Sequence, residues 1–330
     1  MTDFAVVSRF VVDEVLDGRE DAVLDRVRDA YLAHAAGRTV NPDSYFLRFP
    51  DKPDSRIIAL PAFVDGDEPT VGIKWISSFP GNRSVGLPRA SAVLVLNDYR
   101  TGVPVAVLEC ARISSARTAA SAALACDLLG GRAAGSVGVV GCGVISRETL
   151  GFLAHVGVSM DDVRCHDTDP AAAKRFAAGL GQGVAASTAT ADEALDADVV
   201  VLATTALTPH IGPERRFRAG QIVLHLSLRD LAPEVLLAAD NVVDDVDHCL
   251  KANTSPHLVE QLTGNRDFVN GDMAALLEGR VVLDPERPKI FSPFGMGVLD
   301  LALGSFVLAE ARRDGRLTVV PDFAAPATAG

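Results

Sequence analysis

The segment that most restricts the fold of this chain is a short apolar strand that runs into a glycine-rich turn and then a helix. Residues 136–141 (SVGVVG) have the composition of a buried strand, the turn is Gly141-Cys142-Gly143-Val144-Ile145-Ser146, and a helix is expected from about Ser146 to Val156. Further strands are expected at 163–167, 197–203, 221–227 and 241–245, with a helix at 170–180 between the first two. This alternation predicts a doubly wound parallel sheet covered by helices, the α/β architecture of a Rossmann domain.

The glycine-rich turn has the spacing of a dinucleotide-binding loop, GxGxxS, with serine at the third small position. Gly141 allows the tight turn, Gly143 lets the backbone approach a pyrophosphate at the helix N-terminus, and Ser146 permits close packing. Asp167, 24 residues after Gly143, is placed to accept hydrogen bonds from ribose hydroxyls and would repel a 2′-phosphate. The predicted cofactor is therefore NAD, and the alternative is a glycine-rich turn that binds no nucleotide. The predicted contacts also include Val144, Ile145 and Thr204, although Thr204 could equally be an ordinary loop residue.

The first third of the chain has the pattern of an antiparallel meander. Strands are expected at 55–64, 70–77 and 91–97, and the turn residues at 97–102 lead into a returning strand at 103–110. Helices are expected at 18–37, 114–129 and, near the C-terminus, 298–312. The last helix is expected to pack on the first domain. This predicts a discontinuous α+β domain for substrate binding and dimerisation (1–121 and 301–330) and an NAD-binding domain (122–300).

Composition excludes several classes of protein. A net charge of -12 argues against a general nucleic-acid surface. The five cysteines have no CxxC spacing, which argues against a disulfide framework or a zinc site and favours buried thiols. The N-terminal residues do not have the pattern of a signal peptide, and no apolar run approaches the ~20 residues of a membrane span. We therefore expect a cytoplasmic protein that contacts neither membranes nor nucleic acid and holds no metal.

Several cations of the first domain occupy positions that oppose local preference. Lys74 lies within an otherwise apolar strand, where its burial requires an anionic partner. Arg117 is expected to open a helix, where the macrodipole disfavours a positive charge. Arg48 and Arg56 lie on either side of the segment FPDKPDS. These positions are candidates for binding an anionic substrate, and the alternatives are surface side chains or an internal salt bridge.

The chain resembles the ornithine cyclodeaminase/μ-crystallin family. The matching segments occur in family order along nearly the whole chain: GIKWISSFPGN, ARTAAS, GVVGCGVIS and FSPFGMGVLDLAL. Within the family, the chain is similar to the SbnB-like branch of 2,3-diaminopropionate biosynthesis dehydrogenases. The segments that carry this resemblance are NPDSYFLRFPDKPDSRIIALPA, HLSLRDLAPE and NVVDDVDHCLKANTSPHL.

The resemblance implies a homodimer built through the first domain, with NAD as cofactor and with Lys74 and Arg117 holding the α-carboxylate of an amino-acid-derived substrate. In the SbnB-like branch that substrate is N-(2-amino-2-carboxyethyl)-L-glutamate, which is oxidised and hydrolysed to 2-oxoglutarate and L-2,3-diaminopropionate, a building block of siderophores and nonribosomal peptides. Its three carboxylates require more cations, and Arg48, Arg56 and Arg83 are available. Thr118 and Ser227 complete the predicted cofactor contacts.

One departure from the family pattern argues against ornithine cyclodeamination. The position of the cyclodeaminase catalytic Asp, counted back from Glu234, is occupied by Leu228, which cannot accept a proton, although a shift of two residues would use Asp230. The predicted acid–base residue is Lys74, and Asp230 and His225 are further candidates. The alternative functions are cyclodeamination, another amino-acid or imino-acid dehydrogenase activity, and non-catalytic NAD binding.

Overall fold

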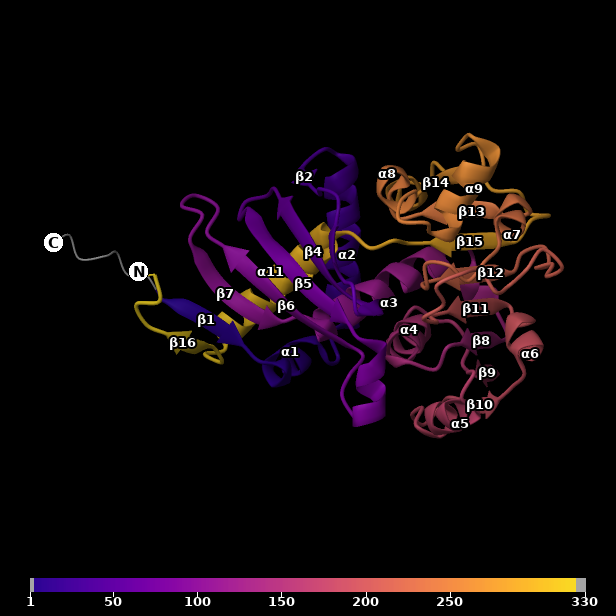
Figure 1. Cartoon of the computed structure of the whole chain (residues 1–330), viewed down its shortest axis with the longest axis horizontal. Helices are drawn as coiled ribbons and strands as arrows, with labels where there is room; N and C mark the ends of the chain where they lie inside the picture. The colour runs from indigo at the N-terminus through magenta and orange to yellow at the C-terminus, as the bar shows by residue number, and fades with distance from the viewer. Residues whose placement is uncertain (1–2, 325–330) are drawn as a thin grey trace. The chain divides into compact units, whose positions relative to one another are not determined.

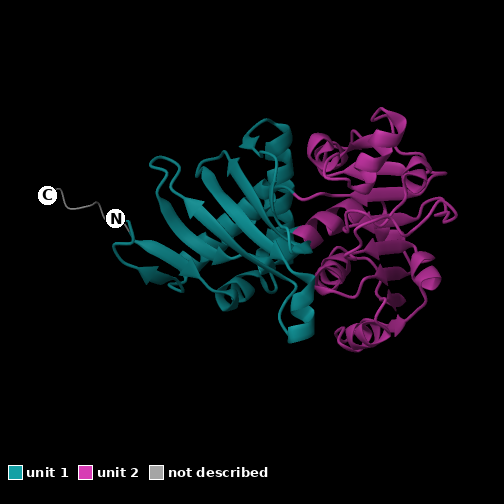
Figure 2. Cartoon of the chain, in the orientation of Figure 1, with its two compact units in different colours: residues 1–117, 296–330 teal, residues 118–295 magenta. Residues whose placement is uncertain are grey.

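The computed structural model describes residues 3–324 and divides the chain into two compact units. Unit 1 comprises Met1–Arg117 and Met296–Gly330, and unit 2 comprises Thr118–Gly295 (Figure 2). The first boundary falls within helix α3 (Ala111–Leu128) and the second directly precedes helix α11 (Gly297–Arg313). Both boundaries lie a few residues before the predicted domain limits, and the functional roles given to the two domains stay predictions.

Unit 1 is built on a mixed eight-stranded sheet whose central part is the predicted meander (Figure 1). The order is β16-β1-β7-β6-β5-β4-β2, with β3 also paired to β4, and only the β1–β7 pairing is parallel. Its strands are β1 (Phe4–Val7), β2 (Thr39–Val40), β3 (Tyr45–Phe49), β4 (Lys52–Val64), β5 (Thr70–Ser78), β6 (Ala90–Asn97), β7 (Pro104–Glu109) and β16 (Thr318–Val320). Its helices are α1 (Arg9–Leu16), α2 (Glu20–Ala35), the 3-10 helix η1 (Pro80–Val85), the first turns of α3, and α11.

One face of this sheet is covered by α11, which also packs against α2. Side chains alternate between the two faces of a strand, so Gly72, Lys74, Ile76 and Ser78 of β5 point to one side and Trp75 to the other. Gly304 of α11 allows close approach to the covered face, because a Cβ there would lie 2.1 Å from Cδ2 of Leu94 on β6. Lys74 is opposite Leu94 in the register and therefore shares the covered face.

Unit 2 contains the predicted doubly wound domain. Its eight strands are all parallel, in the order β10-β9-β8-β11-β12-β15-β13-β14. The strands are β8 (Val137–Val140), β9 (Val163–His166), β10 (Ala186–Thr188), β11 (Val199–Leu202), β12 (Ile222–His225), β13 (Asp240–Val243), β14 (Val269–Asp272) and β15 (Lys289–Ser292). The helices are the rest of α3, the 3-10 helix η2 (Gly131–Ala133), α4 (Val144–His155), α5 (Pro170–Ala178), α6 (Ala191–Leu195), α7 (Pro233–Leu237), α8 (Val246–Cys249), α9 (Ser255–Thr263) and α10 (Met273–Leu277).

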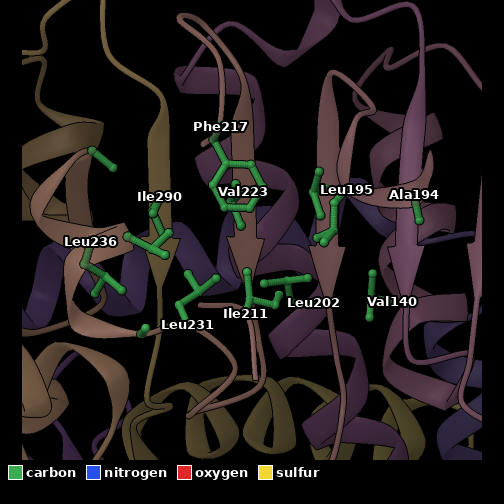
Figure 3. Close-up of a cluster of buried hydrophobic side chains, with 14 of the residues drawn as sticks. Val140, Ala194, Leu195, Leu202, Ile211, Phe217, Val223, Leu231, Leu236 and Ile290 are labelled. Carbon is green, nitrogen blue, oxygen red and sulfur yellow. The ribbon is translucent and has the colours of Figure 1, made fainter. Parts of the chain in front are cut away.

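From β8 to β10 each new strand is added on one side of the sheet, and from β11 onward strands are added on the other side. The strand order therefore reverses between β8 and β11, which is the topological switch point where dinucleotides bind in such sheets. Apolar side chains from the strands and from the segments that follow them form a core against the sheet, with Val140, Leu202 and Val223 from its centre (Figure 3). The predicted fold class, an α/β protein with a Rossmann domain, is confirmed.

The structure also adds to and corrects the predicted elements. The strands expected from the sequence did not include β1, β2, β3, β10, β14, β15 or β16. Helix α3 begins at Ala111, so Arg117 lies in its second turn and does not open the helix as predicted. The macrodipole argument for Arg117 is therefore wrong, because that effect falls off within the first turn.

The five cysteines are all free thiols, and four of them are buried. Within residues 3–324, no group of three or more His, Cys, Asp or Glu side chains is arranged to hold a metal ion. Over the same residues, none of the helices combines the length and the apolar character needed to cross a membrane.

Candidate functional site

The glycine-rich loop of unit 2 joins β8 to α4 and has the geometry that its sequence predicts. Gly141 has a φ of 93°, and a Cβ there would lie 2.7 Å from the carbonyl oxygen of Ala203, so both the conformation and the space require glycine. Ser146 is buried, and its hydroxyl donates to the Gly141 carbonyl at 2.5 Å. A small polar residue at the third position therefore closes the turn by a hydrogen bond as well as by close packing.

The residues around this loop fit NAD. Gly143 is the N-cap of α4, no side chain caps the helix there, and a Cβ on Gly143 would meet no heavy atom within 4 Å. The first amides of α4 thus face space that a pyrophosphate can fill. Asp167 accepts hydrogen bonds from the backbone amides of Cys142 at 2.8 Å and Asp169 at 3.0 Å. Each carboxylate oxygen keeps a further acceptor position, which leaves Asp167 able to bind ribose hydroxyls.

A second group of predicted residues gathers at the carboxyl ends of β11 and β12, around Asp230. The Asp230 side chain is fully buried and accepts hydrogen bonds from Thr204 Oγ1 at 2.6 Å and from the Ser227 hydroxyl. His210 Nε2 lies 3.4 Å from Oδ1 of Asp230, and the His210 side chain is 44% exposed. Asp230 therefore lies beside a solvent-accessible imidazole that the sequence analysis did not single out.

The electrostatics of this group shift the pKa values of His210 and Asp230 in opposite directions. Its hydrogen bond to Asp230 raises the pKa of His210 above the ordinary value. Burial raises the pKa of Asp230, but the hydrogen bond from His210, the nearby His225 and the bonds from Ser227 and Thr204 together hold it below its ordinary value.

His225, the other catalytic candidate here, is a satisfied core residue. Its Nδ1 lies 3.1 Å from Ser292 Oγ, and its Nε2 accepts from the Asp230 amide at 3.2 Å. Burial lowers the pKa of His225 to about 4. The ring is therefore neutral near pH 7 and fixes the backbone that carries Asp230.

In unit 1, Lys74 and Arg117 lie on opposite sides of one carboxylate that the sequence analysis did not identify. Asp300 of α11 is 0% exposed, its Oδ2 accepts from Lys74 Nζ, and its Oδ1 accepts from Arg117 Nε at 3.2 Å. Ser114 accepts from Lys74 Nζ at 3.3 Å and from Arg117 Nη2 at 3.4 Å. The internal salt bridge left open by the sequence is thus present, and it joins two of the predicted substrate-binding cations. An acid within the apolar segment GVLDLAL was the available signal.

Burial and charge act in opposite directions on these groups. Burial lowers the pKa of Lys74, with a further lowering by Arg117 that Asp300 only partly offsets. Burial raises the pKa of Asp300, but Arg117 and Lys74 outweigh it and keep that pKa below its ordinary value. The result is a buried amine that loses its proton more easily than an ordinary lysine, beside a carboxylate that stays ionised.

The other two predicted substrate-binding cations, Arg48 and Arg56, lie opposite each other in neighbouring strands. Arg48 of β3 lies directly opposite Arg56 of β4, and Arg56 lies opposite Ser78 of β5. This register places Arg48 and Arg56 on the same sheet face as Lys74. Thr118 lies in α3 and is half-buried, and its assignment to the cofactor stays a prediction. Leu228, the residue at the cyclodeaminase Asp position, is half-buried.

Comparison with known proteins places these sites in a family. The model of the ornithine cyclodeaminase/mu-crystallin family matches residues 9–314. The N-((2S)-2-amino-2-carboxyethyl)-L-glutamate dehydrogenase of Staphylococcus aureus is 28% identical, over 93% of this chain and 95% of its own. The solved structure of CmnK is 32% identical with a TM-score of 0.89, covering 98% of this chain and 100% of that one. An archaeal alanine dehydrogenase dimer with bound NAD is 25% identical with a TM-score of 0.87, covering 97% and 100%.

The family match spans the whole described meander, the glycine-rich loop and α11, which carries Asp300. It therefore includes every element of both groups of residues described above. The chain belongs to the ornithine cyclodeaminase/mu-crystallin family.

Proposed function

We propose that this protein is an NAD-dependent oxidoreductase of CH–NH bonds that cleaves N-(2-amino-2-carboxyethyl)-L-glutamate oxidatively. One substrate, one NAD and one water give one 2-oxoglutarate, one L-2,3-diaminopropionate, one NADH and one proton. The product amino acid would serve siderophore or nonribosomal peptide biosynthesis. The observation that carries the proposal is the set of cations on one face of the unit-1 sheet, Lys74 with Arg117 and Arg48 with Arg56, because the substrate has three carboxylates to be bound.

The enzyme class and the cofactor agree with the relatives' names, which describe dehydrogenases and a bound NAD. Gly141, Gly143 and the α4 amides would hold the pyrophosphate, and Asp167 the adenosine ribose. The bound cofactor would supply a hydride acceptor for the carbon beside the substrate nitrogen. Thr204 and Ser227 already donate to Asp230, so their proposed cofactor contacts would use their remaining lone pairs or the backbone beside them.

Lys74 is proposed as the acid–base residue. Its Nζ would take the proton from the secondary amine of the substrate, which must be neutral before the carbon–hydrogen bond can break. The lowered pKa of Lys74, caused first by burial, suits a group that must be partly unprotonated to act. Asp300 would hold the amine in place and stabilise its protonated form, and Arg117 would pair with the α-carboxylate. Asp230 has no exposed surface and would act through His210.

We also propose that the active form is a homodimer. The sheet face opposite Lys74 carries a row of paired positions, Tyr45, Ala59, Trp75 and Val93, that runs across four strands. Tyr45, Trp75 and Val93 are exposed by 75%, 41% and 39%. Such an apolar row on a sheet face suits burial against a second copy, and the archaeal relative is described as a dimer.

Absorbance at 340 nm, after NAD and candidate substrate are added, separates this function from its alternatives. Stoichiometric accumulation of NADH with the aminocarboxyethyl-glutamate supports the proposal. A cyclodeaminase would convert ornithine with no net NADH, because it returns the hydride. A non-catalytic member of the family would bind NAD without turnover of either compound.

A further inference from the structure

A cluster of four arginines lies at the end of the unit-1 sheet that is distant from the Lys74–Asp300 pair. Arg56 of β4 is half-buried, and Arg89, directly before β6, is half-buried as well. Arg48 and Arg83 are exposed at its edge. Only Arg48, Arg56 and Arg83 stood out in the sequence, so Arg89 is a new member of the group.

The sheet register fixes how these side chains meet. Arg56 lies opposite Arg48 on one side and opposite Ser78 on the other, and Ser78 lies opposite Ala90, next to Arg89. Arg89 Nη1 donates to Ser78 Oγ at 2.8 Å, and Ser78 is 8% exposed. The nearly buried hydroxyl therefore directs the Arg89 guanidinium toward Arg56.

The cluster has positive charge without a compensating acid. In the part of the chain that the structure describes, no acidic side chain forms an ion pair with any of the four arginines. Burial lowers the pKa of Arg56, and Arg48 lowers it further. Burial likewise lowers the pKa of Arg89, with added repulsion from Arg83 and Arg56. Like charges that are gathered and partly desolvated destabilise a fold unless an anion joins them.

The contrast with Lys74 and Arg117 is informative, because the protein supplies its own carboxylate, Asp300, to that pair. Ser78 is four residues from Lys74 on the same face of β5, about 13 Å along the strand. The long side chains of lysine and arginine can extend toward each other and so shorten the distance between the two charged groups. An extended molecule with anionic groups at both ends can therefore contact the two cation groups together.

We propose that Arg56 and Arg89, oriented by Ser78 and flanked by Arg48 and Arg83, form a second carboxylate subsite that makes the protein selective for dicarboxylic over monocarboxylic substrates. This inference rests on the proposed function in one respect: it identifies the subsite for a carboxylate distant from the reacting carbon. The guanidinium groups would bind that carboxylate through charge-assisted, paired hydrogen bonds.

The test compares two acids of equal chain length on the full-length protein by isothermal titration calorimetry, with NADH present and absent. These acids are 2-oxoglutarate, which has the distal carboxylate, and 2-oxopentanoate, which lacks it. The unaltered protein should bind 2-oxoglutarate about 10- to 100-fold more tightly, as expected for charged hydrogen bonds. In Arg56→Gln and Arg89→Gln the ratio should fall toward one. Arg100→Gln, on the exposed β6–β7 turn of the same unit, should keep the ratio of the unaltered protein.

A stability measurement separates a ligand site from a structural cluster. Without ligand, Arg89→Gln should melt at a higher temperature than the unaltered protein, because one uncompensated cation is removed. With 2-oxoglutarate, the unaltered protein should gain more thermal stability than the variant. Equal affinity for the two acids in the unaltered protein overturns the subsite, as does a preference that survives both substitutions. If the preference is present but the aminocarboxyethyl-glutamate is not oxidised, the subsite stands and the proposed reaction fails.

Discussion

Replacement of Asp300 by asparagine should destabilise unit 1 strongly. Asparagine keeps the size of the side chain but removes the charge that holds Lys74 and Arg117. Lys74 is 2% exposed, and the Arg117 side chain is 10% exposed. Neither cation can therefore regain its hydration without a rearrangement of the sheet and α11. The substitution leaves two buried basic side chains without the carboxylate that they share.

The magnitude follows from the burial of all three groups. Removing one partner of a buried ion pair costs about 3–5 kcal/mol, because the remaining charge is desolvated and unpaired. With a urea slope of about 2 kcal/mol per molar, the unfolding midpoint should fall by on the order of 2 M. The pKa of Asp300 is held below its ordinary value in the folded state. Its contribution is therefore complete above the unfolded carboxyl pKa of about 4 and is lost as the pH falls through the lower folded-state pKa.

The fluorescence of Trp75 provides the assay, since it is the chain's one tryptophan and lies next to Lys74 on β5 of unit 1. The matched control is Asp25→Asn, which removes the exposed ion pair with Arg28 and should change the unfolding free energy by less than about 1 kcal/mol. Adding Lys74→Met to Asp300→Asn should recover part of the loss. A change below 1 kcal/mol in Asp300→Asn would refute the description of this group as a buried, mutually dependent triad.

Three further predictions concern the cofactor, the substrate and the His210–Asp230 pair. Asp167→Ala should weaken NAD binding and relax discrimination against NADP in fluorescence titrations; a wild-type protein that uses NADP as well as NAD contradicts the ribose assignment. Lys74→Met and Arg117→Met should each lower kcat/KM by a factor equivalent to on the order of 3 kcal/mol, while NAD affinity changes little. Near-normal turnover in both variants would show that the two residues do not bind the substrate. In an NMR titration the pKa of His210 should lie above about 6.5 and fall in Asp230→Asn, because the hydrogen bond that His210 donates to that carboxylate raises it; an unchanged value shows that the pair does not interact in solution.

The sequence was sufficient to predict the fold class and the cofactor loop, because both depend on local signals. The strand, the two glycines and the following helix are contiguous in the chain, and Gly141 meets a steric demand that glycine alone satisfies. The meander was predictable for a similar reason, since the neighbouring strands β4, β5, β6 and β7 are also consecutive in the chain. The family resemblance, confirmed by the match over residues 9–314, rested on similarly contiguous segments.

Features that depend on distant parts of the chain were missed. Asp300 is separated from Lys74 by 226 positions and from Arg117 by 183. An acid in an apolar helix indicates a buried partner, but the sequence does not indicate which cations that partner would be. Strand β15 was missed because its four residues follow a polar stretch, and its insertion between β12 and β13 is decided by packing. His210 lies in a loop that reaches Asp230 only when the sheet is assembled.

The central claim is tested most directly by quantifying the products formed from N-(2-amino-2-carboxyethyl)-L-glutamate and NAD by mass spectrometry, with NADH measured in the same samples. The account predicts 2-oxoglutarate, 2,3-diaminopropionate and NADH in equal amounts, and no proline when ornithine replaces the substrate. Release of proline and ammonia from ornithine at a useful rate, with no reaction of the aminocarboxyethyl-glutamate, would contradict it and leave only family membership established.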